Sequence, residues 1–457
     1  MSEIQSFKDK CGVFGITGHR DASYLTMFGL HTLQHRGQES CGIASIDGSN
    51  ISVIKHEGLV SRTFTPQEIE KLQGNMAIGH VRYSTSGDKN AQNSQSCIQP
   101  FCGQTEYGNI AIAHNGNLVD YTAIKQQLLK DNVLFTSNVD TEIILHLIIR
   151  SNEKTLEGKI FDAVTQIKGA FSIVIVTENF ICAVRDRNGI RPLCLGEFEG
   201  SAVVSSESCA ITAIGGQLER DILAGEVLFL YNGGKQKQMF IPNVKEKFCI
   251  FEFVYFSRPD THIDSKSVYT VRKNIGKHLA LEGEHTIPNN AVVVPVPDSG
   301  IPSAMGFAEA SGIPFEFGIV RNHYIGRTFI DPSQSSRASN VNMKHAPNVD
   351  IIKGKKVILV DDSIVRGTTS RKIVELVRGA GASEIHLKIA CPPTKFPCFY
   401  GIDTPCKEDL IANQMTLKEM EVFLGVDSLQ YISIDGLKKA CVGEKFCLAC
   451  FDGDYFV

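Results

Sequence analysis

Residues 357–370 read VILVDDSIVRGTTS, in which two adjacent acids stand between an apolar run and a turn rich in glycine and hydroxyl side chains. The run VILV has the length and β-branched content of a buried parallel strand. Asp361 and Asp362 follow it and can accept hydrogen bonds from vicinal hydroxyls or face a hard cation. The next residues offer backbone N–H groups, hydroxyls and a helix start, which together bind phosphate. The motif predicts a site for a phosphorylated ribose. The alternative is a plain strand-to-helix turn with a solvated acid pair.

This ordered motif resembles the phosphoribosyl pyrophosphate loop of the type I phosphoribosyltransferases. The resemblance implies that Asp361 and Asp362 hold the ribose 2′ and 3′ hydroxyls. The residues that it implies around the 5′-phosphate are Ser363, Ile364, Val365, Arg366, Gly367, Thr368 and Thr369. It does not identify the nucleophile that attacks C1 of the ribose.

A source for that nucleophile is indicated by five segments near the N-terminus. They read KCGVFGI (10–16), LQHRGQESCGIA (33–44), GHVRYSTSG (79–87), IAHNGNLVDY (112–121) and SNVDTE (137–142). In this order they resemble the glutamine amidotransferases with an N-terminal cysteine nucleophile. The resemblance implies that Cys11 attacks the glutamine amide, that Asn115 and Gly116 form the oxyanion hole, and that Gly37 lines the same pocket.

The shape of glutamine suggests roles for two more residues. Arg82 in HVRYST offers bidentate recognition of the α-carboxylate. Asp140 in NVDTE can pair with the α-ammonium. A surface arginine and a helix-capping aspartate are the plain alternatives, as an Asn-Gly turn is for the oxyanion pair. Three nearby cysteines are interpreted as buried small residues or incidental thiols, namely Cys41, Cys97 and Cys102.

Cys11 can use its own α-amino group as the general base only if it stands at a chain start. An α-amine has a pKa of roughly 7.7–8.0, close to working pH. The mechanism therefore predicts cleavage between Lys10 and Cys11, with residues 1–10 as a propeptide. The amidotransferase family includes members with a short self-processed propeptide. Those propeptides tend to end in acids, whereas this one ends Asp9-Lys10.

Both motif sets together resemble the family of glutamine phosphoribosylpyrophosphate amidotransferases, in its iron–sulfur-containing branch. The resemblance implies that ammonia released from glutamine displaces pyrophosphate to give 5-phosphoribosylamine, the first committed step of purine synthesis. It also implies a homotetramer inhibited by purine nucleotides. A regulatory protein that senses phosphoribosyl pyrophosphate without catalysis is one alternative. A glutaminase serving another acceptor, such as that of asparagine or glucosamine phosphate synthesis, is a second.

A magnesium site is expected beside the ribose loop. The segment VPVPDSG (294–300) places Asp298 and Ser299 after a buried strand, where they could meet the pyrophosphate. The family resemblance implies that Ser299 joins Asp361 and Asp362 around Mg²⁺, which keeps several waters and shares substrate phosphates.

The long polar segment 322–348 is rich in serine, asparagine and arginine. Its composition alone favours a solvated loop. The resemblance implies a lid over the pyrophosphate, in which Arg327, Arg337 and Lys344 neutralise the leaving group.

A metal or cluster site is suggested by Cys447 and Cys450, which form a C-L-A-C motif. Cys249 and Cys398 lie in segments that match those ligating a [4Fe–4S] cluster in one branch of the family. The spacing is not that of a ferredoxin, so zinc and unligated thiols remain alternatives. The substitutes considered for these ligands are Cys391, Cys406 and Cys441.

The elements that must position these groups suggest two domains. In the first half, strands mix with helical stretches at 22–35, 121–131 and 138–150, which predicts an α+β N-terminal-nucleophile sandwich of αββα layers. The second half alternates strands at 291–296 and 357–360 with helices at 302–311 and 370–379, which predicts an α/β domain with a parallel sheet. The polar, glycine-containing YNGGKQKQ (231–238) is the expected break. The expected domains are 11–235 and 255–457, the latter with a C-terminal cluster-binding segment.

Composition narrows the class of protein further. The 457 residues are 43% hydrophobic and 21% charged, typical of a globular protein. A net charge of −4 gives no broad nucleic-acid footprint. The longest apolar run is too short to span a bilayer, and the N-terminus has no signal-like apolar core. Fourteen scattered cysteines then indicate reduced thiols in the cytoplasm.

Overall fold

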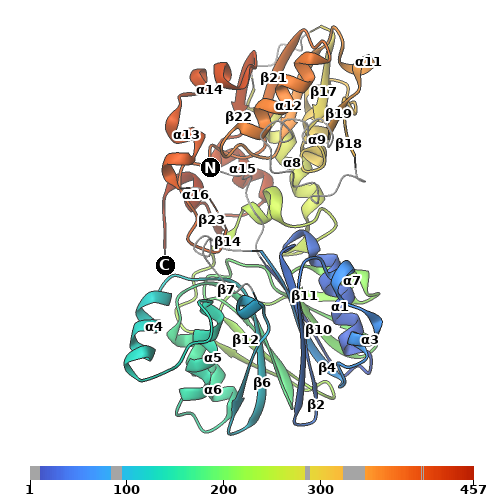
Figure 1. Cartoon of the computed structure of the whole chain (residues 1–457). Helices are drawn as coiled ribbons and strands as arrows, with labels where there is room; N and C mark the ends of the chain where they lie inside the picture. The colour runs from blue at the N-terminus through green and yellow to red at the C-terminus, as the bar shows by residue number, and fades with distance from the viewer. Residues whose placement is uncertain are drawn as a thin grey trace.

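The computed structural model describes residues 11–83, 95–283, 289–322, 345–402, 404 and 406–456. Two lobes follow one another along the chain, with the N-terminal half below and the C-terminal half above in Figure 1. The predicted propeptide, 1–10, lies outside the described residues, as do Arg327, Arg337 and Lys344.

The first lobe is built on two antiparallel sheets. One has the strand order β11-β9-β10-β1-β4-β2-β3 and the other β13-β12-β8-β7-β6-β5. The strands of the first sheet are β1 (Gly12–Thr17), β2 (Ser40–Asp47), β3 (Asn50–Glu57), β4 (Met76–Arg82), β9 (Cys194–Phe198), β10 (Ser201–Ser205) and β11 (Gln217–Asp221). Those of the second are β5 (Phe101–Thr105), β6 (Gly108–Leu118), β7 (Gly169–Thr177), β8 (Phe180–Arg185), β12 (Glu226–Tyr231) and β13 (Gln236–Phe240).

The inner faces of these sheets pack on one another, and helices cover the outer faces. A buried cluster that includes Val13, Ile78, Val174 and Leu228 joins the two sheets. Helix α1 lies on the first sheet and α5 on the second, which gives the layers of an αββα sandwich (Figure 1). The helices of this lobe are α1 (Ala22–Thr32), α2 (Val60–Thr63), α3 (Pro66–Ile69), α4 (Tyr121–Lys130), α5 (Asp140–Arg150), α6 (Leu156–Gln166) and α7 (Ser208–Ala213), with 3₁₀ turns at Leu33–His35 and Gln95–Cys97.

The second lobe contains the predicted parallel sheet, in the order β17-β20-β21-β22. Its strands are β17 (Ala291–Pro295), β20 (Lys356–Asp361), β21 (Glu384–Ile389) and β22 (Ser428–Tyr431). The helices are α8 (Val268–Leu281), α9 (Ile301–Ser311), α11 (Val349–Ile352), α12 (Thr368–Gly379), α13 (Ile411–Gln414), α14 (Leu417–Leu424), α15 (Ile434–Cys441) and α16 (Ala449–Asp452). Short pairs of strands complete the lobe: β14 (Phe248–Cys249) with β23 (Phe446–Cys447), β15 (His262–Ile263) with β16 (Lys266–Ser267), and β18 (Ile319–Arg321) with β19 (His345–Pro347). A π-helical turn at Glu252–Phe256 and a 3₁₀ turn at Lys407–Asp409 connect these elements.

The predicted fold class is confirmed, and the expected helices agree with the observed ones to within three residues. The segment YNGGKQKQ is a hairpin rather than a break. Strand β13 pairs antiparallel with β12 across it, so the second sheet of the first lobe continues to Phe240, beyond the expected end at 235. A polar glycine-rich turn gives the same signal in a hairpin and in a linker. The domain bounds themselves stay a prediction.

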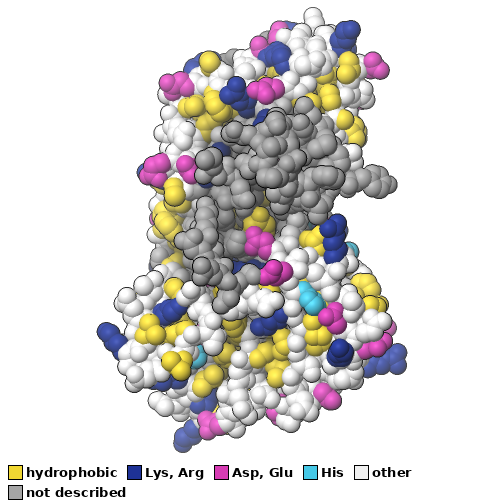
Figure 2. Space-filling view, in the orientation of Figure 1, with side chains coloured by type: hydrophobic (Ala, Val, Ile, Leu, Met, Phe, Trp, Pro, Cys, Tyr) yellow, Lys and Arg dark blue, Asp and Glu magenta, His cyan; other side chains and the backbone are white. Residues whose placement is uncertain are grey.

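Side chains of both charge signs are scattered over the face drawn in Figure 2. No helix among the described residues is long and apolar enough to cross a membrane. All fourteen cysteines are free thiols.

Candidate functional sites

Four of the residues predicted for glutamine chemistry line one cavity of about 590 Å³ in the first lobe. They are Cys11, Arg82, Gly116 and Asp140. Residues far apart in the sequence therefore meet at one place, as the order of the motifs predicts.

The sheet explains why Cys11 and Arg82 are neighbours. Strand β1 begins directly after Cys11 and pairs antiparallel with β4, so that Gly12 lies opposite Val81. Cys11 as a residue is 6% exposed, and its Sγ lies 3.9 Å from the Tyr83 carbonyl oxygen. Its backbone carbonyl accepts a hydrogen bond of 3.2 Å from Arg36 Nε.

Asp140 stands at the first position of α5 and is fixed by the end of β6. Its Oδ2 accepts a 3.0 Å hydrogen bond from the Leu118 N–H, and its Oδ1 lies 3.3 Å from His114 Nδ1. Burial opposes ionisation, but the charge and hydrogen bond of His114 and the backbone donors outweigh it and lower the pKa of Asp140. A carboxylate is thus maintained where an ammonium group can be bound.

Gly37 and Gly116 both lie so close to neighbouring backbone that a side chain would not fit. A Cβ on Gly116 would lie 1.9 Å from the Ala170 carbonyl oxygen, and one on Gly37 would lie 2.6 Å from the backbone carbon of Val81. Gly37 does not line the cavity; it packs against the backbone that leads to Arg82.

Asn115 is fully buried beside Gly116 on β6 and is not among the residues lining the cavity. Within the described chain, its amide nitrogen and oxygen have no hydrogen-bond partner. Buried amides are normally satisfied, so this group is available to a ligand or to a shifted neighbour.

The cavity has further lining residues that the sequence prediction missed. They include Tyr83, Gln99, His114, Asn117, Tyr121, Lys125 and Asn138. Most of them lie in or beside the segments already singled out, and that proximity was the available signal. Lys125 is placed by α4, one turn after Tyr121, and its Nζ donates to Asn138 Oδ1 at 3.0 Å.

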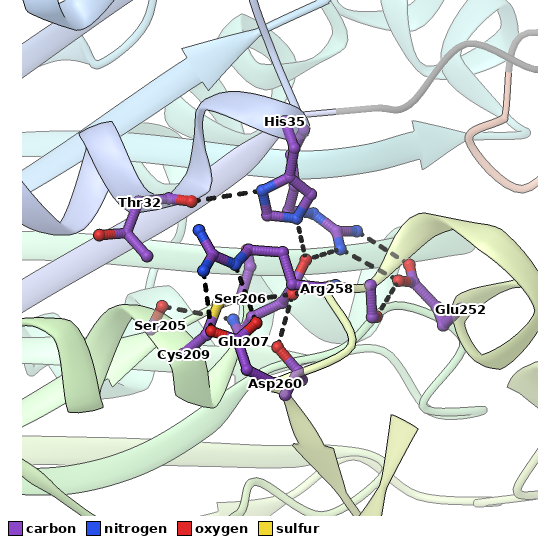
Figure 3. A network of polar contacts seen from close by, with 12 residues as sticks. Thr32, His35, Ser205, Ser206, Glu207, Cys209, Glu252, Arg258 and Asp260 are labelled. Atoms are coloured by element: carbon purple, nitrogen blue, oxygen red, sulfur yellow. Dashed lines mark hydrogen bonds and ion pairs between the residues drawn. The ribbon is translucent and has the colours of Figure 1, made fainter. Parts of the chain in front are cut away.

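A buried charge network reaches the Cys11 carbonyl through Arg36 and was also missed; Figure 3 shows the part of it around Glu207 and Glu252. Arg36 Nη1 is 2.6 Å from Glu207 Oε1, and Arg36 Nη2 is 2.8 Å from Glu252 Oε1. His35 Nε2 lies 2.7 Å from the same oxygen of Glu207, and Arg191 Nη2 lies 2.9 Å from Glu252 Oε1. Burial is outweighed by the charges and hydrogen bonds of His35 and Arg36, which hold the pKa of Glu207 far below its usual range.

The network connects parts of the chain that pattern reasoning does not relate. Arg36 and Glu252 are 216 positions apart in the sequence. Glu207 also accepts hydrogen bonds from the Arg258 N–H at 2.9 Å and the Thr261 hydroxyl at 2.7 Å. Glu207 therefore connects the first lobe to the segment with which the second lobe begins.

The second predicted site forms a cavity of about 190 Å³ at the carboxyl ends of β17 and β20. The predicted residues that line it are Ser299, Asp361, Asp362, Ser363, Val365, Arg366, Gly367, Thr368 and Thr369. Tyr255, His345 and Ser370 also line it and were missed. Ile364 is 2% exposed and does not line the cavity.

The geometry of this loop suits an anionic ligand. Gly367, with φ of 76°, turns the chain into α12, whose N-terminus faces the cavity. Burial and the adjacent Asp362 raise the pKa of Asp361 well above its usual range. Arg366 Nη2 is paired with Asp409 Oδ2 at 2.8 Å, and Asp298 Oδ2 with Arg321 Nη1 at 2.5 Å.

The four cysteines of the predicted cluster surround a third, small cavity (the thiol cavity) in the second lobe. It is lined by Cys249, Cys398, Cys447 and Cys450, together with residues that include Arg191, Tyr400 and Tyr455. The parallel pairing of β14 and β23 sets Cys249 directly opposite Cys447. Burial and the neighbouring thiols raise the pKa of Cys450 well above its usual range.

The other cysteines lie elsewhere. The substitutes Cys391 and Cys441 are buried and Cys406 is exposed, and none of them lines the thiol cavity. Near the glutamine cavity, Cys41 and Cys97 are buried, whereas Cys102 is exposed.

Each lobe matches a known family of protein domains. Residues 80–213 match the model of a glutamine amidotransferase domain, and residues 268–404 match that of a phosphoribosyl transferase domain. An amidophosphoribosyltransferase of Rhizobium etli is 46% identical over 98% of this chain and 92% of its own length.

Two solved structures are similar over the whole chain. The glutamine phosphoribosylpyrophosphate amidotransferase of Bacillus subtilis, complexed with ADP and GMP, is 44% identical with a TM-score of 0.90 and covers 97% of each chain. A structure described as the allosteric regulatory enzyme of purine biosynthesis is also 44% identical, with a TM-score of 0.91, and covers 97% of this chain and 96% of its own.

Proposed function

The chain belongs to the amidophosphoribosyltransferase family, and on that premise we propose that its two lobes carry out one reaction in two steps. The first lobe hydrolyses glutamine, and the ammonia displaces pyrophosphate from 5-phosphoribosyl 1-pyrophosphate in the second. The products are 5-phosphoribosylamine, glutamate and pyrophosphate, and the enzyme is a pentosyltransferase of purine biosynthesis. The observation that carries this function is the presence of a glutamine-type cavity and a ribose-phosphate-type cavity in one chain.

In the first cavity, Cys11 is the proposed nucleophile that forms a glutamyl thioester. Arg82 binds the α-carboxylate and Asp140 the α-ammonium, because both line the same cavity as Cys11. The Gly116 N–H and the Asn115 amide stabilise the oxyanion. The unpartnered amide of Asn115 supports this role, since a bound oxyanion would supply the missing acceptor.

Removal of residues 1–10 is part of the proposal. The freed α-amine of Cys11 is the general base, with a pKa of roughly 7.7–8.0 in an unperturbed chain. Cys11 has a φ of 39°, a backbone conformation that side-chain-bearing residues rarely adopt. Strain of this kind clusters at functional sites, which supports a catalytic role for Cys11. Intact-mass analysis of fully active protein tests the cleavage, and retention of Met1–Lys10 would exclude it.

In the second cavity, Asp361 and Asp362 are proposed to bind the ribose hydroxyls, and residues 363–369 the 5′-phosphate. Ser299 and both acids would hold Mg²⁺, because their oxygens suit a hard cation and they line one cavity. Bound magnesium would supply charge neutralisation at the pyrophosphate. Loss of activity on chelation, restored by magnesium, is the expected result.

A [4Fe–4S] cluster held by Cys249, Cys398, Cys447 and Cys450 is proposed for the thiol cavity. All four thiols line that cavity, and cysteine thiolates are the usual ligands of an iron–sulfur cluster. The cluster would supply a structural cross-link between the C-terminal segment and β14. Iron, sulfide and a brown absorbance in anaerobically purified protein are expected; zinc alone would contradict the cluster.

We further propose a lid, an assembly state and a compartment for the protein. The segment 322–348 acts as a lid in which Arg327, Arg337 and Lys344 meet the pyrophosphate. The protein assembles as a homotetramer, and its compartment is the cytoplasm. Limited proteolysis with and without phosphoribosyl pyrophosphate tests the lid, and sedimentation tests the assembly.

The function itself is tested by measuring pyrophosphate release from phosphoribosyl pyrophosphate with glutamine as the nitrogen source. Equal amounts of glutamate and pyrophosphate are expected. Binding of phosphoribosyl pyrophosphate without turnover would indicate a sensor protein. Glutamate without pyrophosphate would indicate another acceptor.

A further inference from the structure

Arg191 is a buried arginine that lies between the thiol cavity and the charge network that reaches Cys11. Arg191 is 1% exposed, and it lines the thiol cavity together with the four cysteines. Its Nη2 lies 2.9 Å from Glu252 Oε1. Across the described ranges, its Nε and Nη1 are buried and have no hydrogen-bond partner. A buried cationic donor without an acceptor is costly, so this position calls for an anion.

Two other buried arginines show how the protein satisfies such groups elsewhere. Arg185 donates from all three nitrogens to backbone carbonyl oxygens, at 2.6–2.9 Å. Arg272 donates from Nε to the Phe253 carbonyl and from Nη2 to the Ser257 carbonyl, each at 2.7 Å. Arg191 differs because its unused donors belong to a side chain that lines the thiol cavity.

The carboxylate that pairs with Arg191 is shared with a second arginine. Glu252 is its ion-pair partner, but the same carboxylate accepts two hydrogen bonds from Arg36, at 3.0 and 2.8 Å. Arg36 in turn donates from Nε to the Cys11 carbonyl. One guanidinium is therefore in contact with the thiol cavity and, through two residues, with the glutamine nucleophile.

We propose that Arg191 is the charge partner of the anionic iron–sulfur cluster, and that it ties the cluster to Cys11 through Glu252 and Arg36. This inference rests on the cluster proposed above. Nε and Nη1 donate to cluster or cysteine sulfur, which retains the cluster and raises its reduction potential. Arg191 is a positioning residue for Cys11, not a group that touches glutamine.

The test compares anaerobically purified full-length wild type with Arg191→Met and Arg191→Gln, neither of which carries the charge. Both variants are expected to lose iron several-fold faster to a chelator and to have a more negative midpoint potential, because an added electron is less well stabilised. Arg191→Lys is expected to restore much of the potential. The glutaminase kcat should fall several-fold in the neutral variants, with the KM for glutamine little changed.

Arg272→Lys is the matched control, since it alters a buried arginine that binds carbonyls and does not line the cavity. It is expected to keep the wild-type potential. Wild type without iron would defeat the cluster proposal, and this inference with it. Wild type with iron, but with either neutral variant at the wild-type potential and rate of iron loss, would overturn this inference alone. A shifted potential with unchanged glutaminase kcat would overturn the connection to Cys11.

Discussion

Buried polar contacts fix the side chains that line the glutamine cavity. His114 illustrates this, since its ring lies against Asp140 and its carbonyl accepts from His80 Nε2 at 3.1 Å. Burial lowers the pKa of His80 to about 3, and the nearby charges of Arg82, His114 and Lys55 act in the same direction. His80 is therefore neutral in the folded protein near neutral pH.

Replacement of His80 by Gln should make the stability of the protein less sensitive to acid. In wild type, the unfolded chain binds a proton at His80 near pH 6.5, whereas the folded chain resists it until pH about 3. The contribution of His80 to the free energy of unfolding is thus fully present above pH 6.5. Below pH 6.5 it is lost at up to roughly 1.4 kcal/mol per pH unit. Thermal unfolding between pH 7.5 and 5 should show a smaller fall in Tm for His80→Gln than for wild type.

An exposed histidine provides the control for this experiment. His31→Gln on α1 should reproduce the wild-type pH profile. A parallel fall in Tm for wild type and His80→Gln would show that His80 is not the group responsible.

At this scale the sequence predicts motif residues well and their partners poorly. Cys11, Arg82 and Asp140 each lie in a short motif, so their convergence on one cavity could be predicted. Glu207 and Glu252 lie in no such motif, and their partners are far away in the sequence. Only the fold brings these charges together.

Among the elements, strand ends and tight backbone contacts set the sites. Strand β6 carries Asn115 and Gly116 alongside β7, where Gly116 lies opposite Phe171 and packs against the Ala170 carbonyl. In the other lobe, β20 ends at Asp361, the first residue of the acid pair, and α12 starts a few residues later at Thr368. Both sites therefore depend on backbone placement that larger residues would disturb.

Gly116→Ala should disrupt the oxyanion segment. Its Cβ would lie 1.9 Å from the Ala170 oxygen, so β6 or β7 must shift, which costs about 1–3 kcal/mol or more. Glutamine-dependent activity should fall at least tenfold, while ammonia-dependent activity should change little. Steady-state assays with each nitrogen source and thermal unfolding measure these effects.

Gly379→Ala is the matched glycine control. A Cβ there would meet nothing within 4 Å, and the residue ends α12. It should be neutral or stabilising by up to about 1 kcal/mol. Equal losses from both substitutions would refute the steric explanation.

The order and type of elements could also be predicted, because hydrophobic periodicity and turn residues are local signals. The hairpin between β12 and β13 could not, since its glycines gave the signal of a linker. The pairing of β14 with β23 was equally inaccessible, because each strand is two residues long.

Across the whole molecule, buried contacts join the two lobes near both the nucleophile and the thiol cavity. Glu252 contacts Arg36 of the first lobe and the Ser257 hydroxyl of the second, at 2.7 Å. Asn117, which lines the glutamine cavity, donates to the Phe399 carbonyl at 2.9 Å, one residue after Cys398. The two lobes are thus connected beside Cys11 and beside the thiol cavity.

Glu252→Ala should destabilise the joint between the lobes. It leaves Arg191 without its carboxylate partner and Arg36 with Glu207 alone, and breaking a buried pair typically costs about 3–5 kcal/mol. Calorimetry should show a lower Tm and a less cooperative transition. Glu309→Ala, which removes an exposed ion pair with Lys273, should leave the wild-type transition. An unchanged transition in Glu252→Ala would contradict the structural role of the network.

The central claim is that sulfur at Cys11 releases ammonia that the second lobe consumes. The most direct measurement is phosphoribosylamine synthesis by Cys11→Ala with glutamine and, separately, with ammonium salts. The variant should lose glutamine-dependent synthesis by roughly a thousandfold or more and keep ammonia-dependent synthesis near the wild-type rate. Undiminished synthesis from glutamine, or loss of synthesis from ammonia in a folded protein, would contradict the account.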